Sequence, residues 1–294
     1  MANREQGNET SITEFILLGF VSLPELKILL FLLFLVVYIA TMAGNILIVV
    51  LIVVIQYLHT PMYLFLGNLS CLETWYTSTI LPRILASLLT EVRTISFSGC
   101  LTQYYFFASM VATECLLLSV MSYDRYLAIG KPLHYAARMS GRSCFQLAAG
   151  SWIGGFLCSG IITLSISQLT FCGSKDIDHF FCDLIPLINL SCNDPQLMEI
   201  LVFTLCLIFS VVPFLLTLMS YICVIVTILR IPSTTGRKKT FSTCSSHLIV
   251  VTMYYGTLLI AYMFPTTNTL RDIKKVLSVV CTVLTPLVKP SSTA

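Results

Sequence analysis

The stretch ILLFLLFLVVYIATMAGNILIVVLIVV, residues 28–54, decides the fold class of this chain. It carries no charged side chain and exceeds the roughly 20 apolar residues that a helix needs to cross the hydrocarbon core of a bilayer. The run without Asp, Glu, Lys or Arg continues to Glu73, which is too long for one crossing. The segment QYLHTP, residues 56–61, interrupts it. The sequence therefore predicts two membrane-spanning helices joined by a short loop.

The composition of the whole chain supports the same conclusion. Of its 294 residues, 56% are hydrophobic and only 11% are charged, whereas soluble domains carry roughly 25% charged residues. Such a chain cannot cover a surface that faces water. The small net charge of +3 suggests no nucleic-acid partner, and neither CxxC pairs nor a His-rich tract predicts a metal site. The polar start of the chain predicts no cleaved signal peptide.

The remaining apolar runs predict an all-α membrane protein, a bundle of seven transmembrane helices. We expect an N-terminal tail (1–26), a helical domain (27–290) and a short C-terminal remnant (291–294). The predicted spans are about 28–55, 62–89, 99–123, 143–169, 199–229, 240–264 and 270–290.

The distribution of charge predicts the orientation of the bundle. Lys and Arg favour cytoplasmic loops, and here they gather after the third and fifth spans, whereas nearly all acids lie in the tail and the other loops. The N-terminus is therefore expected outside the cell. Asn8 begins a glycosylation triplet on the tail, which agrees with this orientation. The basic residues are Arg125, Lys131, Arg138 and Arg142 after the third span, and Arg230, Arg237, Lys238 and Lys239 after the fifth.

Asp124 and Arg125 stand side by side at the cytoplasmic end of the third span. A charge near hydrocarbon is costly, so it lies at a boundary or has a function. On position alone, one interpretation is an arginine whose aliphatic stem anchors a helix end while its guanidinium reaches water. The other is a functional pair.

Several motifs in order along the chain settle the interpretation. They are GN (44–45), LHTPMYLFLGNLS (58–70), MSYDRYLAIGKPLHY (121–135), SY (220–221), KKTFSTCSSHLIVV (238–251) and TPLVKP (285–290). With them, the chain resembles the olfactory receptors, a branch of the rhodopsin-like G-protein-coupled receptors, over almost its whole length.

The resemblance implies an odorant receptor of the plasma membrane that binds small volatile ligands among its helices. The ligand would act through a stimulatory heterotrimeric G protein and cyclic AMP. It also implies an activation switch in which Asp124 pairs with Arg125 at rest, whereas Tyr221 binds Arg125 in the active state. Tyr126, Lys238 and Lys239 are the other residues that the resemblance implies for activation and G-protein coupling. A solvated basic rim is an equal alternative for the two lysines. The implied ligand-binding residues are Tyr104, Phe107, Ala108, Val111, Ala112, Leu205, Cys206, Phe209, Tyr255, Leu258, Tyr262, Val279 and Thr282; ordinary interhelical packing is the alternative for such a stripe.

Glu73 and Glu114 place two carboxylates at membrane depth, and they resemble the ion-binding acids of the family, with Asn45 nearby. Close carboxylates repel one another unless a cation or a shared proton lies between them. A bound sodium ion and a protonated, hydrogen-bonded pair are therefore both open. No other cofactor is expected.

Four cysteines belong to the outer loops or helix ends, and four cysteines allow three pairings. The resemblance pairs Cys100 with Cys182 and Cys172 with Cys192. The chain has 12 cysteines, and we expect those in the spans to be packing residues.

The last predicted span departs from the family pattern. The uncharged run 276–288 would cover roughly 20 Å of a hydrocarbon core about 30 Å thick. Lys289 stands where the family has Asn, and Thr293 where it has Tyr. We therefore expect a seventh helix truncated at its cytoplasmic end, with weak or absent coupling; a natural short variant that signals is the alternative.

The sequence disfavours two other classes of protein. A transporter is disfavoured because no inverted repeat or row of intramembrane charges is visible. An enzyme is disfavoured because no nucleophile–base set is visible at either membrane face. Membrane lipid is the remaining expected partner.

Overall fold

The computed structural model describes residues 13–19, 26–90, 93–171, 175–192, 196–230 and 234–263, with some side chains of the last range excepted. Asn8, Cys172 and the predicted seventh span lie outside the described residues. The length and end of that span therefore stay predictions.

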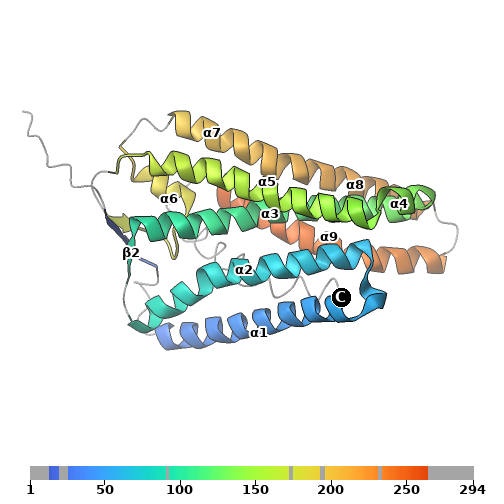
Figure 1. The fold of residues 1–294 in the computed structure, drawn as a ribbon, viewed down its shortest axis with the longest axis horizontal. Coiled ribbons are helices and arrows are strands. Elements are labelled where there is room, and N and C mark those ends of the chain that lie inside the picture. Colours follow the sequence, from blue (N-terminus) through green and yellow to red (C-terminus); the bar gives the residue numbers. More distant parts are fainter. Residues whose placement is uncertain are drawn as a thin grey trace, which may run out of the picture.

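Long helices run alongside one another as a bundle along the longest axis of the molecule (Figure 1). Four helical stretches are long and apolar enough to cross a membrane, namely Lys27–Val54, Phe97–Gly130, Gly141–Ser167 and Gln196–Leu229. This confirms a multi-pass helical membrane protein. The bundle helices are α1 (Lys27–Val54), α2 (Pro61–Thr90), α3 (Phe97–Gly130), α5 (Gly141–Ser167), α7 (Gln196–Cys206), the π-helix η3 (Leu207–Val211), α8 (Val212–Leu229) and α9 (Thr234–Met263).

Two helices extend beyond their predicted spans by more than one turn. Helix α3 continues to Gly130, past the predicted end at residue 123, and α9 begins at Thr234, before residue 240. Hydropathy marks where the apolar side chains stop, whereas backbone hydrogen bonding continues for as long as nothing breaks the helix. The Asp124–Arg125 pair therefore lies inside a helix rather than in the loop that follows it.

Local sequence explains several helix boundaries. The Ser96 hydroxyl accepts a hydrogen bond from the Gly99 amide at 3.1 Å and caps α3, and Ser140 caps α5 in the same way through Ser143. Serine is among the preferred N-cap residues. The wide turn η3 ends two residues before Pro213. Since proline has no amide hydrogen to donate to the preceding turn, the regular hydrogen-bond ladder is interrupted there.

A three-stranded sheet closes one end of the bundle, in the order β2–β1–β3. Strand β1 (Glu14–Leu17) pairs antiparallel with β2 (Thr94–Ser96) and parallel with β3 (Asp176–Ile177). Phe15 is fully buried and its ring lies 5.6 Å from that of Phe171. Residues Glu14–Leu17, which lie within the predicted N-terminal tail, thus form the central strand of this sheet.

The two ends of the bundle differ. The sheet and the short helix α6 (Leu184–Asn189) lie at one end, which we call the disulfide end, and α4 (Pro132–Arg138) lies at the other, the α4 end (Figure 1). The short helix η2 (Gln56–Leu58) joins α1 to α2. Helix α3 contributes to both buried clusters of the core, one central and one near the disulfide end.

Candidate functional site

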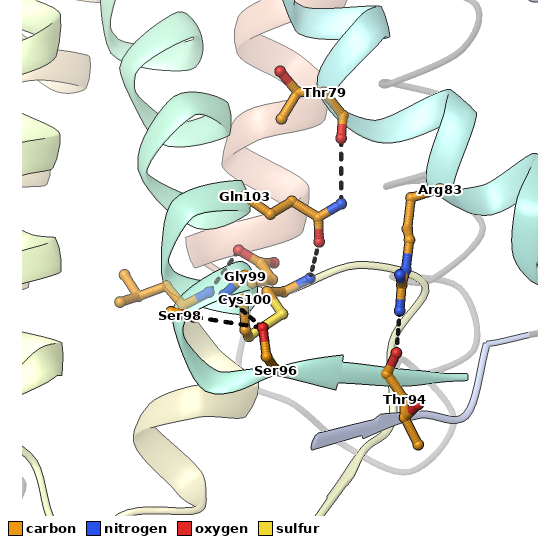
Figure 2. The surroundings of a disulfide bond; sticks show 11 residues. Thr79, Arg83, Thr94, Ser96, Ser98, Gly99, Cys100 and Gln103 are labelled. Carbon is orange, nitrogen blue, oxygen red and sulfur yellow. Dashed lines mark hydrogen bonds between the residues drawn. A yellow bond between two sulfur atoms is a disulfide. The ribbon is translucent and has the colours of Figure 1, made fainter. Parts of the chain in front are cut away.

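Cys100 of α3 and Cys182 form a disulfide, with their Cα atoms 5.5 Å apart. Cys182 lies between β3 and α6, in the long loop that connects α5 to α7. Gln103, one turn further along α3, supports this bridge (Figure 2). Its side-chain amide donates to the Thr79 carbonyl at 3.3 Å and its oxygen accepts from the Cys182 amide at 3.2 Å. The predicted pairing is therefore confirmed, and Gln103 ties α2, α3 and the loop together.

The second predicted bridge is described only in part. Cys192 is disulfide-bonded, and its amide donates to the Thr170 carbonyl at 2.9 Å. Cys172 lies outside the described residues, so its pairing with Cys192 stays a prediction.

An aromatic column descends from the loop into the bundle. The Phe181 ring, next to the disulfide, lies 4.9 Å from Phe107 of α3 and 4.5 Å from His179. Phe107 in turn lies 5.5 Å from Tyr76 of α2. Aromatic pairs at such separations are favourable beyond their buried area. Through this column Phe107, a predicted ligand-binding residue, contacts Phe181 of the loop.

The predicted ligand-binding residues of the described helices fall into two groups. Tyr104 is buried in the cluster near the disulfide end, and Phe107 and Tyr255 are buried in the central cluster. Side chains packed against the first cluster are Ala108, Leu205 and Phe209, and those packed against the second are Val111 and Leu258. Residues 104, 107, 108 and 111 of α3 form a stripe at positions i, i+3, i+4 and i+7, which is about 100° wide on the helix surface. The two edges of this stripe therefore pack against different clusters.

Other members of the predicted set are less informative. Ala112 is partly buried and Cys206 is exposed, so Cys206 does not join the buried clusters. Tyr262, Val279 and Thr282 lie outside the side chains that the structure describes.

Two consecutive tyrosines fasten α9 to α3 at mid-bundle. The Tyr254 hydroxyl donates to the Val111 carbonyl at 2.8 Å, and the Tyr255 hydroxyl donates to the Cys115 carbonyl at 2.9 Å. The Tyr255 ring also lies 5.1 Å from Phe214 of α8. Sequence reasoning included Tyr255 and missed Tyr254, because hydrogen bonds to a neighbouring backbone leave no periodic signal.

Asn45, Glu73 and Glu114, the predicted ion site, are all buried, on α1, α2 and α3. The Asn45 amide donates to a Glu73 carboxylate oxygen at 3.5 Å, and its Oδ1 has no hydrogen-bond partner among the described residues. These three side chains supply only oxygen atoms toward a ligand, the donor type that hard cations prefer. Within the described residues, no three His, Cys, Asp or Glu side chains form a metal cluster.

At the α4 end, the predicted pairing of Asp124 with Arg125 is not present. The buried Asp124 carboxylate instead accepts a hydrogen bond from the Tyr135 hydroxyl at 2.9 Å, and the Arg125 guanidinium contacts the Met62 sulfur of α2. Adjacent residues on a helix do not face each other, so the two side chains leave α3 in different directions. Tyr135 is therefore the partner of Asp124 in this structure.

Tyr135 shows the effect of this contact. It lies on α4, a helix that begins at Pro132 and is otherwise exposed. Burial and the neighbouring Asp124 carboxylate raise the pKa of Tyr135 well above its usual value, because both disfavour a phenolate. Its hydroxyl therefore stays protonated as a donor to Asp124. Sequence reasoning missed this role, although Tyr135 ends the quoted motif.

Tyr221 of α8 is buried and its hydroxyl hydrogen-bonds Nδ1 of His247 on α9. The rings lie 5.8 Å apart and nearly parallel. Nε2 of His247 is buried and has no hydrogen-bond partner among the described residues. Sequence reasoning missed this role of His247, which the structure places as the partner of Tyr221.

The other residues predicted to take part in coupling are Tyr126, next to Arg125 on α3, and Lys238 and Lys239 on α9. Tyr126 is partly buried, with its ring 6.4 Å from Tyr123 and the Lys131 ammonium 5.9 Å from its centre. Lys238 and Lys239 belong to the first turns of α9, and their side chains are outside the description.

Comparison with known proteins gives one consistent result. The sequence model of the family described as "Olfactory receptor" matches residues 34–292. The chain is 48% identical to human olfactory receptor 11L1 over 97% of this chain and 89% of that protein. It is 46% identical to human olfactory receptor 11A1 over 97% of this chain and 90% of that protein. It is 45% identical to mouse olfactory receptor 5AP2 over 96% and 89% of the respective chains.

Proposed function

Because this chain belongs to the olfactory receptor family, we propose that it binds small, apolar volatile molecules inside its helical bundle and activates a stimulatory heterotrimeric G protein. The family match over residues 34–292 carries this proposal. Membership also makes the chain a G-protein-coupled receptor and not an enzyme. It therefore signals through a conformational change rather than by chemistry on its ligand.

We propose seven crossings in the plasma membrane, with the N-terminus and the disulfide end outside the cell. Six crossings are supported by α1, α2, α3, α5, the α7–α8 stretch and α9, and the seventh by the apolar run at 276–288. The Cys100–Cys182 disulfide supports an oxidising compartment at its end of the bundle. The Arg and Lys residues near α4 support a cytoplasmic face at the other end.

The proposed ligand site lies beneath the disulfide, between Phe107 of α3 and Tyr255 of α9. The support for this position is the aromatic column, in which Phe181 next to the disulfide packs against Phe107. Ligand pockets are mostly apolar with a few polar groups that fix orientation. The Tyr254 and Tyr255 hydroxyls already donate to α3 carbonyls, so a ligand there would meet apolar ring surface and favour hydrophobic odorants.

The proposed switch lies at the α4 end. Asp124 is held by Tyr135, Arg125 by Met62 and Tyr221 by His247. Each contact joins two different segments, so opening the bundle at this end would exchange partners. A ligand that favours the open state then shifts the population by its differential affinity for the two states. Arg125 is the residue that we expect to be exposed to the G protein.

We also propose that sodium occupies the site formed by Asn45, Glu73 and Glu114. The assignment is supported by the burial of all three side chains and by the Asn45 oxygen, which has no hydrogen-bond partner in the described part of the chain. Sodium would supply one positive charge that offsets the repulsion between two buried carboxylates. The two glutamates would then link α2 and α3 in the resting state.

A cyclic-AMP assay on intact cells tests the proposed function. Cells expressing the chain are exposed to a library of volatile compounds, and surface level is measured in parallel through an N-terminal epitope tag. We expect at least one compound to raise cyclic AMP, and Arg125→Ala to abolish that response at equal surface level. A chain that reaches the surface and responds to no compound would contradict the signalling proposal.

A further inference from the structure

A groove of 740 Å³ opens between α1, α2 and α5 at the α4 end. Its lining includes none of the predicted ligand-binding residues and none of Asp124, Arg125 and Tyr221. Its volume falls inside the range of about 300–1,000 Å³ that is common for sites that bind small molecules. Its walls include Ile52 of α1, Leu64 of α2 and Cys144 of α5.

Most of the lining of the groove is apolar, and its polar side chains lie mainly at its mouth, in the loop between α1 and α2. His59 and Thr60 line the groove there, with His59 Nε2 3.0 Å from the Ile52 carbonyl oxygen, whereas Val49 and Asn68 line it more than one turn further into α1 and α2. From Pro61 to Cys71, both of which line the groove, helix α2 rises about 15 Å. This equals about half of a hydrocarbon core roughly 30 Å thick, so the groove has the depth of one leaflet. An amphipathic molecule with a polar head at the mouth and an apolar tail inside fits this arrangement.

The chain segments next to the groove carry basic residues and no acidic ones. Arg138 and Arg142 flank the lining residues Met139 and Gly141 in the chain, and neither 55–61 nor 131–143 contains an acidic residue. Arg138 donates to the Tyr123 hydroxyl at 3.3 Å. Arg142 is exposed and has no ion pair or side-chain hydrogen bond with the described residues. Basic residues between helices at a cytoplasmic face attract anionic lipid headgroups.

We propose that this groove is a binding site for one anionic phospholipid of the cytoplasmic leaflet. An acyl chain lies along Ile52 and Leu64, and the phosphate lies at the mouth beside His59, Thr60 and Arg142. The assignment of the leaflet rests on the proposed orientation of the bundle. A zwitterionic phospholipid has the same acyl chains and would lack the net negative charge that these basic residues select.

A glycine in the lining offers a position for a larger side chain that would occupy the groove. Gly141 lines the groove, and a Cβ atom added there would meet no other atom within 4 Å. Gly150, also on α5, has equally open surroundings and does not line the groove. Gly141→Leu therefore fills the site, and Gly150→Leu is its matched control.

The test is photo-crosslinking of the full chain in lipid nanodiscs, which does not depend on any signalling response. Phosphatidylserine or phosphatidylcholine that carries a diazirine on one acyl chain is the probe, and mass spectrometry locates the labelled peptides. We expect phosphatidylserine to label peptides containing Ile52, Leu64 or Cys144. Gly141→Leu should remove this labelling and Gly150→Leu should leave it unchanged.

Arg142→Gln tests the headgroup contact, with Arg230→Gln at the exposed end of α8 as its control. Labelling by phosphatidylserine should fall about fivefold in Arg142→Gln and stay unchanged in Arg230→Gln, as expected for one basic residue near an anionic surface. Disulfide content and thermal unfolding confirm that each variant is folded. Equal labelling by both lipids, or equal labelling of Gly141→Leu and Gly150→Leu, would overturn the proposal.

Discussion

Helices α3 and α5 meet at Gly155, and replacing this glycine by alanine should destabilise the bundle. A Cβ atom at position 155 would lie 2.1 Å from the Thr113 hydroxyl oxygen, 2.8 Å from the Ser109 carbonyl oxygen and 2.8 Å from the Thr113 amide nitrogen. The threonine side chain can rotate, but the two backbone atoms belong to a helix. Restoring ordinary contact distances therefore requires α5 to move away from α3 by about half an ångström.

The expected magnitude follows from two opposing effects. Overpacking of this kind costs about 1–3 kcal/mol, whereas alanine in a helix interior is favoured over glycine by about 1 kcal/mol. Gly150→Ala has the propensity gain without the clash, because its added Cβ meets no atom within 4 Å. The difference between the two variants therefore isolates the packing cost. At about 2–4 °C per kcal/mol, Gly155→Ala should unfold about 2–12 °C below Gly150→Ala.

Thermal unfolding of the purified chain in detergent, followed with a thiol-reactive fluorophore, measures this difference. Buried thiols such as Cys115 and Cys158 become reactive when the bundle opens. Gly160→Ala is a second control, since its added Cβ would lie at an ordinary 3.8 Å from Tyr105. If Gly155→Ala unfolds at the same temperature as Gly150→Ala, the backbone contact between α3 and α5 is not as tight as argued.

Three further predictions concern the switch, the disulfide and the ion site. Tyr135→Phe removes a hydrogen bond to the buried Asp124 carboxylate, worth about 1.5–3 kcal/mol, and should raise basal cyclic AMP at equal surface level; unchanged basal signal would reject the role of Tyr135. Cys182→Ala breaks the bridge to Cys100 and should abolish surface expression or the ligand response, since losing such a bond commonly costs about 2–5 kcal/mol; wild-type trafficking and response would contradict this. Glu114→Gln removes one buried charge and should abolish the sodium dependence of the ligand response, whereas a wild-type response already insensitive to sodium would favour the protonated pair.

The predictions that succeeded from sequence depend on properties of single residues or short runs. Residues 28–54 are apolar enough to require a membrane, whatever they pack against. The break at 56–61 separates two helices because polar loop residues and proline act locally. The pairing of Cys100 with Cys182 came from family resemblance and is confirmed.

Sequence alone established that this chain is a multi-pass helical membrane protein of the olfactory receptor family. Tertiary structure alone decided that Asp124 binds Tyr135 rather than its neighbour Arg125, and that Tyr254 fastens α9 to α3. It also decided that residues Glu14–Leu17 form the central strand of a sheet. The reason is geometric: hydropathy and helical period describe one segment at a time, whereas a hydrogen-bond partner depends on the rotation and depth of the neighbouring segment.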